Sequence, residues 1–379
     1  MEISNVASFA ISRLTKAGFS AYLVGGCVRD FIMGKTPHDF DIATSATPEE
    51  MLSVFEDVTT FESGITHGTV AIHKEGENVE MTTFRSDGDY TDHRHPESVA
   101  FSKDIKDDLS RRDFTVNAMA YNESNGLVDL FGGKEDIDKK LIRCVGAPKR
   151  RFEEDALRIL RALRFSSVLG FEIEENTSNA IHTQKELLKY VSRERIAEEL
   201  KKLLSGKGVR RVIEEYKDVL KILFEGIEPN GEKIENSKED KRLLLFLDSK
   251  EFEKNVLSLN LSKKERDVLI SAHKLKDSTP DSVIEMKKLI SKYGKDAVGL
   301  MFSDSEFYKK ALLSDCLTVK DLKVGGEDIL SLGIKPSLRV GQILNEILQE
   351  VIEEKTPNDR QILIKRLKDK IKFQKNIDK

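Results

Sequence analysis

The chain has 379 residues, of which 34% are charged and 7% are aromatic, and it contains no tryptophan. A chain of this length can form about two to four modules with well-buried cores. The composition favours helices with much solvated surface. The formal net charge of −4 argues against a protein that binds nucleic acid through its overall charge, although phosphate binding depends on local cationic surface.

The three cysteines, Cys27, Cys144 and Cys316, are far apart and form no C-x-x-C pair. This pattern argues against zinc and disulfide bonds and for a reducing compartment. The first four residues do not begin a signal peptide, and no apolar run approaches the roughly 18 residues of a membrane-spanning helix. We therefore expect a cytoplasmic protein with no membrane contact.

The amino-terminal part of the chain alternates between predicted strands and helices. Residues 21–24 predict a strand, which Gly25-Gly26 separates from a helix expected to begin near Val28. Residues 68–73 and 79–84 have the β-branched composition of strands and are bounded by Gly or Asn. We expect a mixed sheet flanked by helices, with the order of its strands left open.

Asp39 and Asp41 are the candidate catalytic residues and metal ligands. Carboxylates at i and i+2 of a strand point to the same face, where they can hold Mg²⁺ beside substrate phosphates. The preceding Gly25 and Gly26 would let a triphosphate approach the backbone, and the helix that follows adds amide donors. Each signal is common alone, but their combination indicates nucleotidyl transfer. Glu80, on a later strand, is either a third metal ligand or an exposed carboxylate.

The pattern becomes helical from Phe152 onward. Four charged residues recur every three positions and predict one ridge along a helix. These are Asp155, Arg158, Arg161 and Arg164. By itself such a ridge is typical of surface ion pairs, each worth about 0.3–0.5 kcal/mol.

Two later segments stand out by composition. Residues 225–240 contain Pro, Gly and many charges and predict a loop between helical modules. Residues 361–379 hold seven Lys or Arg against two Asp, and they are either a solvated helix end or an RNA-backbone contact. The cations proposed for that contact are Lys365, Arg366, Lys368, Lys370 and Lys372.

Three blocks in order resemble the superfamily of class II tRNA nucleotidyltransferases and bacterial poly(A) polymerases. They are Gly25-Gly26-x-Val28-Arg29-Asp30 with Asp39-x-Asp41, then Arg111-Arg112-Asp113-Phe114-Thr115-Val116-Asn117-Ala118-Met119-Ala120, then Arg151-Phe152-x-Glu154-Asp155-Ala156-Leu157-Arg158-x-x-Arg161-Ala162-x-Arg164-Phe165. The resemblance is close over residues 1–205, and looser beyond. Within the superfamily the chain is similar to bacterial CCA-adding enzymes. The string from Gly325 to Leu330 resembles the tail of these enzymes in low-GC bacteria, but the chain departs at Pro336-Ser337-Leu338-Arg339, where the family often has a second Gly and Pro.

The resemblance implies an α+β protein with a nucleotidyltransferase-type mixed-sheet head and an all-helical neck, body and tail. The expected boundaries are 1–145 for the catalytic head, 146–205 for the neck with its nucleotide-selecting helix, 206–320 for the body and 321–379 for a tRNA-binding tail. It implies template-independent addition of C, C and A to tRNA from CTP and ATP. Pyrophosphate would leave in a reaction assisted by two Mg²⁺ ions at Asp39 and Asp41.

The resemblance also assigns roles to the charged ridge. Cytosine and adenine both place an acceptor ring nitrogen beside an amine donor, whereas uracil and guanine present the reverse. Asp155 and Arg158 would therefore accept C and A and reject U and G, because a mismatch leaves charged groups unpaired. Arg161, Arg164 and Arg112 would reach phosphates or sugar, and Arg29 would do the same at the head.

A charged loop at residues 85–96 contains His93 and His95. No zinc-ligand spacing accompanies these histidines. The loop resembles a flexible segment that CCA-adding enzymes use when switching from C to A, and CC-adding relatives typically lack it. Its presence favours a protein that adds the terminal A.

Other functions remain open at this stage. An A-adding tRNA nucleotidyltransferase shares every head motif and is the first alternative. A poly(A) polymerase ranks below it, because the chain lacks a long basic extension, and a non-catalytic RNA-binding module ranks last, because it has no use for Asp39 and Asp41. The oligomeric state is left open.

Overall fold

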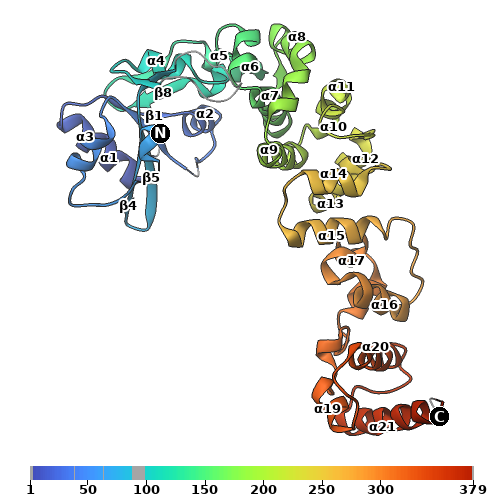
Figure 1. Cartoon of the computed structure of the whole chain (residues 1–379). Coiled ribbons are helices and arrows are strands. Elements are labelled where there is room, and N and C mark those ends of the chain that lie inside the picture. Colours follow the sequence, from blue (N-terminus) through green and yellow to red (C-terminus); the bar gives the residue numbers. More distant parts are fainter. Residues whose placement is uncertain (1–2, 38, 63, 88–98, 378–379) are drawn as a thin grey trace. The chain divides into compact units, whose positions relative to one another are not determined.

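A computed structural model describes residues 3–37, 39–62, 64–87 and 99–377 (Figure 1). They group into two compact units. The first unit is Met1–Glu251 with Ser258–Asn260, and the second is Phe252–Leu257 with Leu261–Lys379. The histidines His93 and His95, and most of the loop predicted around them, lie outside the described residues.

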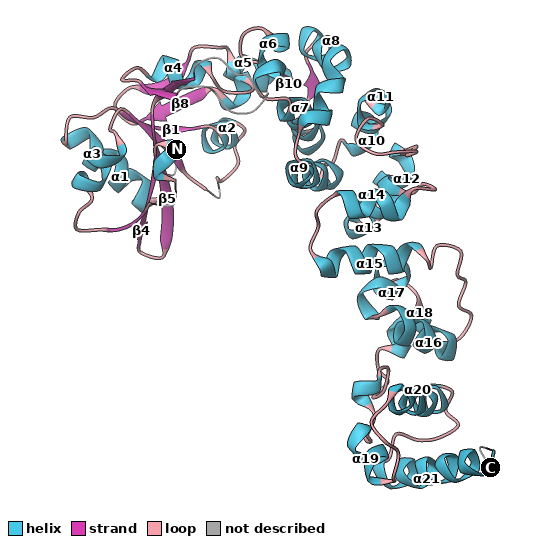
Figure 2. Cartoon of the chain, viewed as in Figure 1, coloured by secondary structure: helices cyan, strands magenta, loops and turns pink. Residues whose placement is uncertain are grey.

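The first unit contains a seven-stranded sheet in the order β3-β4-β5-β2-β1-β8-β9. Its strands are β1 (Ala21–Val24), β2 (Asp41–Thr44), β3 (Thr59–Phe61), β4 (Thr69–Lys74), β5 (Glu77–Thr83), β8 (Met119–Asn122) and β9 (Gly126–Asp129). Neighbouring strands are antiparallel except β2 and β5, which are parallel. The prediction of a mixed sheet is confirmed, and Figure 2 shows these strands gathered in the amino-terminal part of the chain.

Helices cover both faces of this sheet. The helical elements of the head are α1 (Asn5–Lys16), α2 (Gly26–Ile32), α3 (Pro48–Val54), η1 (Ile65–His67), α4 (Ile105–Ser110), η2 (Thr115–Asn117) and α5 (Gly133–Lys139). On one face Leu109 of α4 packs against Tyr22, Val24 and Ala43. Leu23 alternates with these residues and points to the other face, where α1 contacts β1, β2 and β5. The sheet is therefore buried on two sides.

The rest of the first unit is helical. Its elements are α6 (Pro148–Glu154), α7 (Leu157–Leu169), α8 (Glu175–Gln184), η3 (Lys185–Tyr190), α9 (Arg193–Ser205), α10 (Val209–Glu215), α11 (Lys217–Leu220), α12 (Gly231–Glu235) and α13 (Glu239–Leu247). One short parallel pair, β10 (Leu141–Ile142) with β11 (Glu172–Ile173), departs from the expected all-helical neck. A second pair, β6 (Arg85–Asp87) with β7 (Val99–Phe101), is antiparallel.

Two expectations from the sequence need correction. The helix expected near Val28 begins at Gly26, directly after the turn at Gly25. The predicted loop at 225–240 contains α12, which begins where the Asn230 side chain accepts a hydrogen bond from the backbone N–H of Lys233. Capping by a polar side chain can start a helix inside a charged, Gly-containing stretch.

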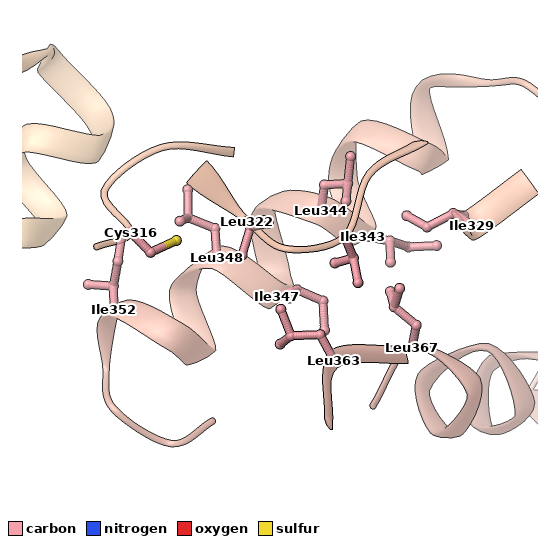
Figure 3. Close-up of a cluster of buried hydrophobic side chains, with 11 residues drawn as sticks. Cys316, Leu322, Ile329, Ile343, Leu344, Ile347, Leu348, Ile352, Leu363 and Leu367 are labelled. Carbon is pink, nitrogen blue, oxygen red and sulfur yellow. The ribbon is translucent and has the colours of Figure 1, made fainter. Parts of the chain in front are cut away.

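The second unit is formed by helices, and two clusters of buried side chains lie among its described residues. Its elements are α14 (Phe252–Ser258), α15 (Lys263–His273), α16 (Val283–Tyr293), α17 (Lys295–Phe302), α18 (Glu306–Ala311), η4 (Val319–Asp321), α19 (Gly326–Ser331), α20 (Leu338–Ile352) and α21 (Arg360–Ile377). Met286 and Ile290 of α16 belong to the first cluster. Ile343 and Ile347 of α20 face Leu363 of α21 in the second (Figure 3), as expected for a helix with one apolar stripe.

None of the described helices has both the length and the apolar character needed to cross a membrane. The four parts expected from the sequence, with boundaries near residues 145, 205 and 320, remain a prediction.

We predict that Gly206→Ala destabilises the first unit by roughly 1–3 kcal/mol, the usual cost of overpacking. Gly206 ends α9, and an added Cβ would lie 2.6 Å from the carbonyl oxygen of Ser167 in α7. The control is Gly341→Ala in α20, where no atom lies within 4 Å of the added carbon. It should stabilise the chain by about 0.5–1 kcal/mol. Thermal and urea unfolding of both variants would check this, and an unchanged midpoint for Gly206→Ala would contradict it.

Candidate active site

The turn between β1 and α2 requires glycine for two reasons. Gly25 has φ +74° and ψ −129°, a conformation that side chains disfavour. A Cβ on Gly25 would also lie 3.1 Å from Nη1 of Arg112. The turn therefore leaves the backbone at the start of α2 open, next to a guanidinium group.

The carboxylates lie on the adjacent strands. Asp41 is the first residue of β2 and pairs in register with Glu80 of the parallel strand β5. Paired positions place their side chains next to each other on one face. Asp39 precedes β2, so the expectation that both aspartates lie on the strand is wrong for Asp39. The charge of Asp39 nevertheless acts on Asp41, so the two carboxylates are close.

The electrostatics of Asp41 indicate a place for a cation. Asp41 is accessible to solvent at the start of β2, but partial desolvation by the surrounding protein raises its pKa. The charges of Glu80 and Asp39 raise this pKa further, and Arg112 partly offsets them. Accumulated carboxylates are the hard oxygen ligands that Mg²⁺ and similar ions prefer. Across the described residues no cluster of three or more His, Cys, Asp or Glu is arranged as a metal site. Mg²⁺ beside a nucleotide commonly uses only one or two protein carboxylates together with substrate phosphates, so the residues present fit such an ion.

Two arginines border the same turn. The Arg29 guanidinium donates to Asp30 and, at 2.8 Å, to Oδ1 of Asn117. Arg112 donates to the buried Asp108 at 2.9 Å. Burial by itself would raise the pKa of Asp108, but the charges of Arg112 and Arg111 hold it below its usual value. Both arginines are held in place beside Gly25 and Gly26, where they can neutralise an anion.

The predicted ridge is not one continuous helix face. Helix α6 ends at Glu154, Asp155 has extended backbone, and α7 begins at Leu157. The Asp155 carboxylate accepts from the backbone N–H of Leu157 at 3.1 Å and from Arg195 at 2.8 Å. An Asp side chain that bonds nearby backbone amides competes with helix formation. Asp155 therefore starts α7 instead of lying along it.

Arg158 is buried, although a surface position was expected for an isolated ridge. Its Nη1 donates to Glu154 at 2.7 Å and to the carbonyl of Arg151, and its Nη2 donates to the carbonyl of Arg111 at 3.0 Å. These bonds use three of the five N–H donors of a guanidinium. They fix its orientation against the head.

Arg161 and Arg164 face buried carboxylates. Arg161 donates to Asp113 at 2.8 Å and 2.6 Å, and Arg164 donates to Glu199 at 2.7 Å. The guanidinium carbons of Arg161, Arg164 and Arg29 lie 5.4, 3.6 and 5.6 Å from the centre of the Phe165 ring. Two arginines of α7 and one of α2 are thus brought together around a single aromatic side chain.

Several partners of these arginines were not singled out from the sequence. They are Asp108, Asp113, Asn117, Glu154 and Glu199. Asp108 and Glu154 precede Arg112 and Arg158 by four residues, the spacing of a helical ion pair, and could have been found. Glu199 lies 35 residues from Arg164, and only the packing of α7 against α9 brings it near.

Three known domain families match successive parts of the chain. Residues 21–143 match the poly A polymerase head domain, residues 170–229 match the probable RNA and SrmB-binding site of polymerase A, and residues 235–367 match the putative tRNA nucleotidyltransferase domain 2. The fold and the site define a nucleotidyltransferase with a poly(A) polymerase-type head.

Relatives that match nearly the whole chain show which kind of nucleotidyltransferase it is. The chain is 34% identical to the CCA-adding enzyme of Limosilactobacillus fermentum, covering 94% of each protein. It is 35% identical to the CCA-adding enzyme of Staphylococcus saprophyticus, covering 90% of this chain and 91% of the relative. The chain belongs to the CCA-adding enzyme family of tRNA nucleotidyltransferases, which confirms the resemblance found in the sequence motifs.

Solved structures of CCA-adding enzymes have the same fold as this chain. The Bacillus stearothermophilus CCA-adding enzyme in complex with CTP matches with a TM-score of 0.76 and 27% identity, covering 98% of both chains. The Thermotoga maritima CCA-adding enzyme complexed with tRNA matches in fold with a TM-score of 0.63 and 23% identity, covering 97% of this chain and 95% of the other. The mixed-sheet head followed by helices is the fold of these enzymes.

We predict that Asp41→Asn raises the melting temperature of the metal-free protein near neutral pH. A carboxyl with a raised folded-state pKa destabilises the fold while it is ionised, so the gain should shrink as pH falls through that pKa. Added Mg²⁺ should stabilise the original chain more than the variant. The control is Asp138→Asn on the exposed face of α5, which should change neither quantity. A lower melting temperature for Asp41→Asn without metal would contradict the assignment.

Proposed function

We propose that this protein adds C, C and A to the 3′ end of tRNA from CTP and ATP, without a nucleic-acid template and with release of pyrophosphate. The observation that carries the proposal is the grouping of Asp39 and Asp41 with the Gly25 turn and Arg112. Support comes from relatives that are CCA-adding enzymes over nearly their full length and from the CTP complex of one related structure. We expect the reaction to take place in the cytoplasm.

In this proposal Asp39 and Asp41 hold two divalent ions, expected to be Mg²⁺. When bound, such ions lower the pKa of the attacking hydroxyl and neutralise charge on the phosphates. The open backbone at Gly25 and Gly26 and the first amides of α2 lie against the triphosphate. Glu80 is either a further ligand or a charge that keeps the site attractive to cations.

Arg29 and Arg112 contribute the fixed positive charge of the site. Their hydrogen bonds to Asn117 and Asp108 hold the two guanidinium groups beside the turn before a nucleotide arrives. Groups that are already in place need no reorganisation as charge develops on the leaving pyrophosphate. Arg161 and Arg164 would reach sugar or phosphate from α7.

Base selection is assigned to Asp155 and Arg158. The Asp155 carboxylate would accept the exocyclic amine of C or A, and Arg158 would donate to the adjacent ring nitrogen. Arg158 retains two N–H donors beyond those bonded to Glu154, Arg151 and Arg111. Because those three bonds fix the orientation of the guanidinium, they would also orient the two remaining donors.

The proposal keeps four functional parts: a catalytic head at 1–145, a neck at 146–205, a body at 206–320 and a tail at 321–379 that binds tRNA. Addition of A alone is the principal alternative. The purified chain should be incubated with tRNAs that end before, or within, the CCA sequence, with CTP, with ATP and with both. Incorporation of two C residues followed by one A supports the proposal, and incorporation of A alone on tRNA ending in CC supports the alternative.

We predict that Asp155→Ala lowers the rate and weakens discrimination of CTP over UTP by roughly 10- to 100-fold, the value of a hydrogen bond to a charged group. Competition assays with CTP and UTP on tRNA lacking CCA would measure the ratio. Arg164→Ala serves as the control, because loss of a phosphate or sugar contact should weaken the binding of all nucleotides alike. If the selectivity for CTP over UTP is unchanged in Asp155→Ala, Asp155 does not read the base and serves only as an ion-pair partner of Arg195.

Within the tail, the cations of α21 divide into two groups. Arg366 and Lys370 pair with Glu350 of α20, and Lys370 also pairs with Glu346. Lys365 and Lys368 are exposed on the same helix. The side chain of Lys372 lies outside the part that the structure describes. Because carboxylates of α20 hold Arg366 and Lys370, Lys365 and Lys368 are better placed to contact RNA phosphates. Such contacts hold RNA without reading its sequence.

We predict that Lys365→Gln combined with Lys368→Gln raises the KM for tRNA and flattens its dependence on salt, because fewer counterions are released. The KM for CTP should stay constant. Arg366→Gln combined with Lys370→Gln is the matched pair on the helix side that faces α20, and it should lower the unfolding temperature of the tail instead. Measurements of both constants across a salt series would separate the two effects. Identical salt slopes for the first pair and the unchanged chain would exclude the RNA contact.

A further inference from the structure

Asn117 is a buried amide at the junction of the head motifs. It ends the 3-10 turn η2, and only 7% of its surface is exposed. The turn is anchored by Thr115, whose hydroxyl donates to the buried Asp136 at 2.6 Å. The turn that carries Asn117 is therefore anchored to α5.

Both the oxygen and the nitrogen of the Asn117 side-chain amide form hydrogen bonds. Its Oδ1 accepts from Nη1 of Arg29 at 2.8 Å, and its Nδ2 donates to Oδ1 of Asp113 at 3.4 Å. Its backbone carbonyl lies 3.5 Å from Nη1 of Arg112, which donates to it. The partners determine the orientation of the amide, because a guanidinium can only donate and a carboxylate can only accept.

The hydrogen-bond chain continues into the neck. The second oxygen of Asp113 accepts two bonds from Arg161 of α7, and Arg161 reaches Glu199 at 3.5 Å. Burial by itself would raise the pKa of Asp113, but Arg161 and the backbone N–H of Phe114 hold it low, so it stays an acceptor. Asn117 is the neutral link between Arg29 and the ion pair that Asp113 of the head forms with Arg161 of the neck.

We propose that Asn117 is a positioning residue that aligns Arg29 with Asp113, and so sets the spacing between the triphosphate cradle at Gly25 and Arg161 of α7. This inference rests on the proposed function. Only a side chain of this size that both accepts and donates can satisfy Arg29 and Asp113 together. An Asp would repel Asp113, and a Leu would serve neither partner.

The expected consequence is specific to the nucleotide. Arg29 faces the phosphates, which CTP and ATP share, so loss of its alignment raises the KM for both nucleotides alike. Base selection by Asp155 and tRNA binding by the tail do not pass through Asn117. The selectivity for CTP over UTP and the KM for tRNA therefore stay constant.

The experiment compares the full-length chain with Asn117→Leu and Asn117→Asp in tRNA extension assays, with unfolding temperatures measured alongside. We expect the KM for CTP and for ATP to rise roughly tenfold in Asn117→Leu, as for loss of a hydrogen bond to a charged group. Asn122→Leu is the matched control. Asn122 is a buried amide of the same head that donates to the carbonyl of Ala21, away from the turn. It should lower the unfolding temperature without changing either KM.

A double-mutant cycle separates positioning from a general structural role. In an Arg29→Ala background, Asn117→Leu should raise the KM for CTP less than twofold further, because the arginine that it aligns is gone. Full multiplication of the two effects would overturn the inference. Asn117→Asp should lose activity through repulsion from Asp113, and adding Asp113→Asn should recover part of it by restoring one donor and one acceptor. Lack of any recovery would also count against the proposed link.

Calorimetric binding of CTP in the presence of Mg²⁺ keeps the inference independent of the proposed reaction. If the unchanged chain binds CTP but extends no tRNA, the proposed function fails while the affinity ratio between the chain and Asn117→Leu still tests the alignment. If extension proceeds and the affinity ratio is near one, the alignment by Asn117 is wrong and the proposed function stands. Should Asn117→Leu not fold, Asn117→Asp supplies the same affinity comparison.

Discussion

The active-site region depends on one constraint, which is that its partly buried arginines must each find a carboxylate or an aromatic face. Arg29, Arg161 and Arg164 surround Phe165, and Phe165 packs edge-on against Phe114 of the head with ring centroids 5.7 Å apart. A guanidinium removed from water is costly unless it is paired and hydrogen-bonded. The pairing therefore also sets the spacing between α2 of the head and α7, and hence the geometry offered to a nucleotide.

The carboxylates of the same region have pKa values shifted in opposite directions. Asp108 and Asp113 have lowered pKa values because arginines compensate for their burial. Asp41 has a raised pKa because it is partly desolvated and because its neighbours Glu80 and Asp39 are themselves acidic. The charge of the first pair is already compensated, and it holds arginines in position. The second group retains charge for a cation, and the divergence of pKa values within one site is a mark of function.

Much of this could be predicted from residues and spacing. The strand before Gly25, the mixed sheet and the helical remainder follow from local composition and from the resemblance of three motif blocks. The extended backbone at Asp155 could not be predicted, because a three-residue charge period is also typical of a continuous helix. The resemblance assigns Arg158 to base selection, but its burial and its bonds to Glu154 and to the Arg111 carbonyl depend on packing that the charge period does not encode.

The sequence by itself determined which chemistry the chain can support, because Gly25, Asp39 and Asp41 are functional through their residue types and their short-range spacing. Tertiary structure decided which arginines are available and how they are held. Glu199 and Asn117 lie 35 and 88 residues from the arginines they bind. Contacts at such separations arise from the packing of α7 on α9 and of η2 beside α2, and no local pattern encodes them, since many remote carboxylates and amides could satisfy the same guanidinium.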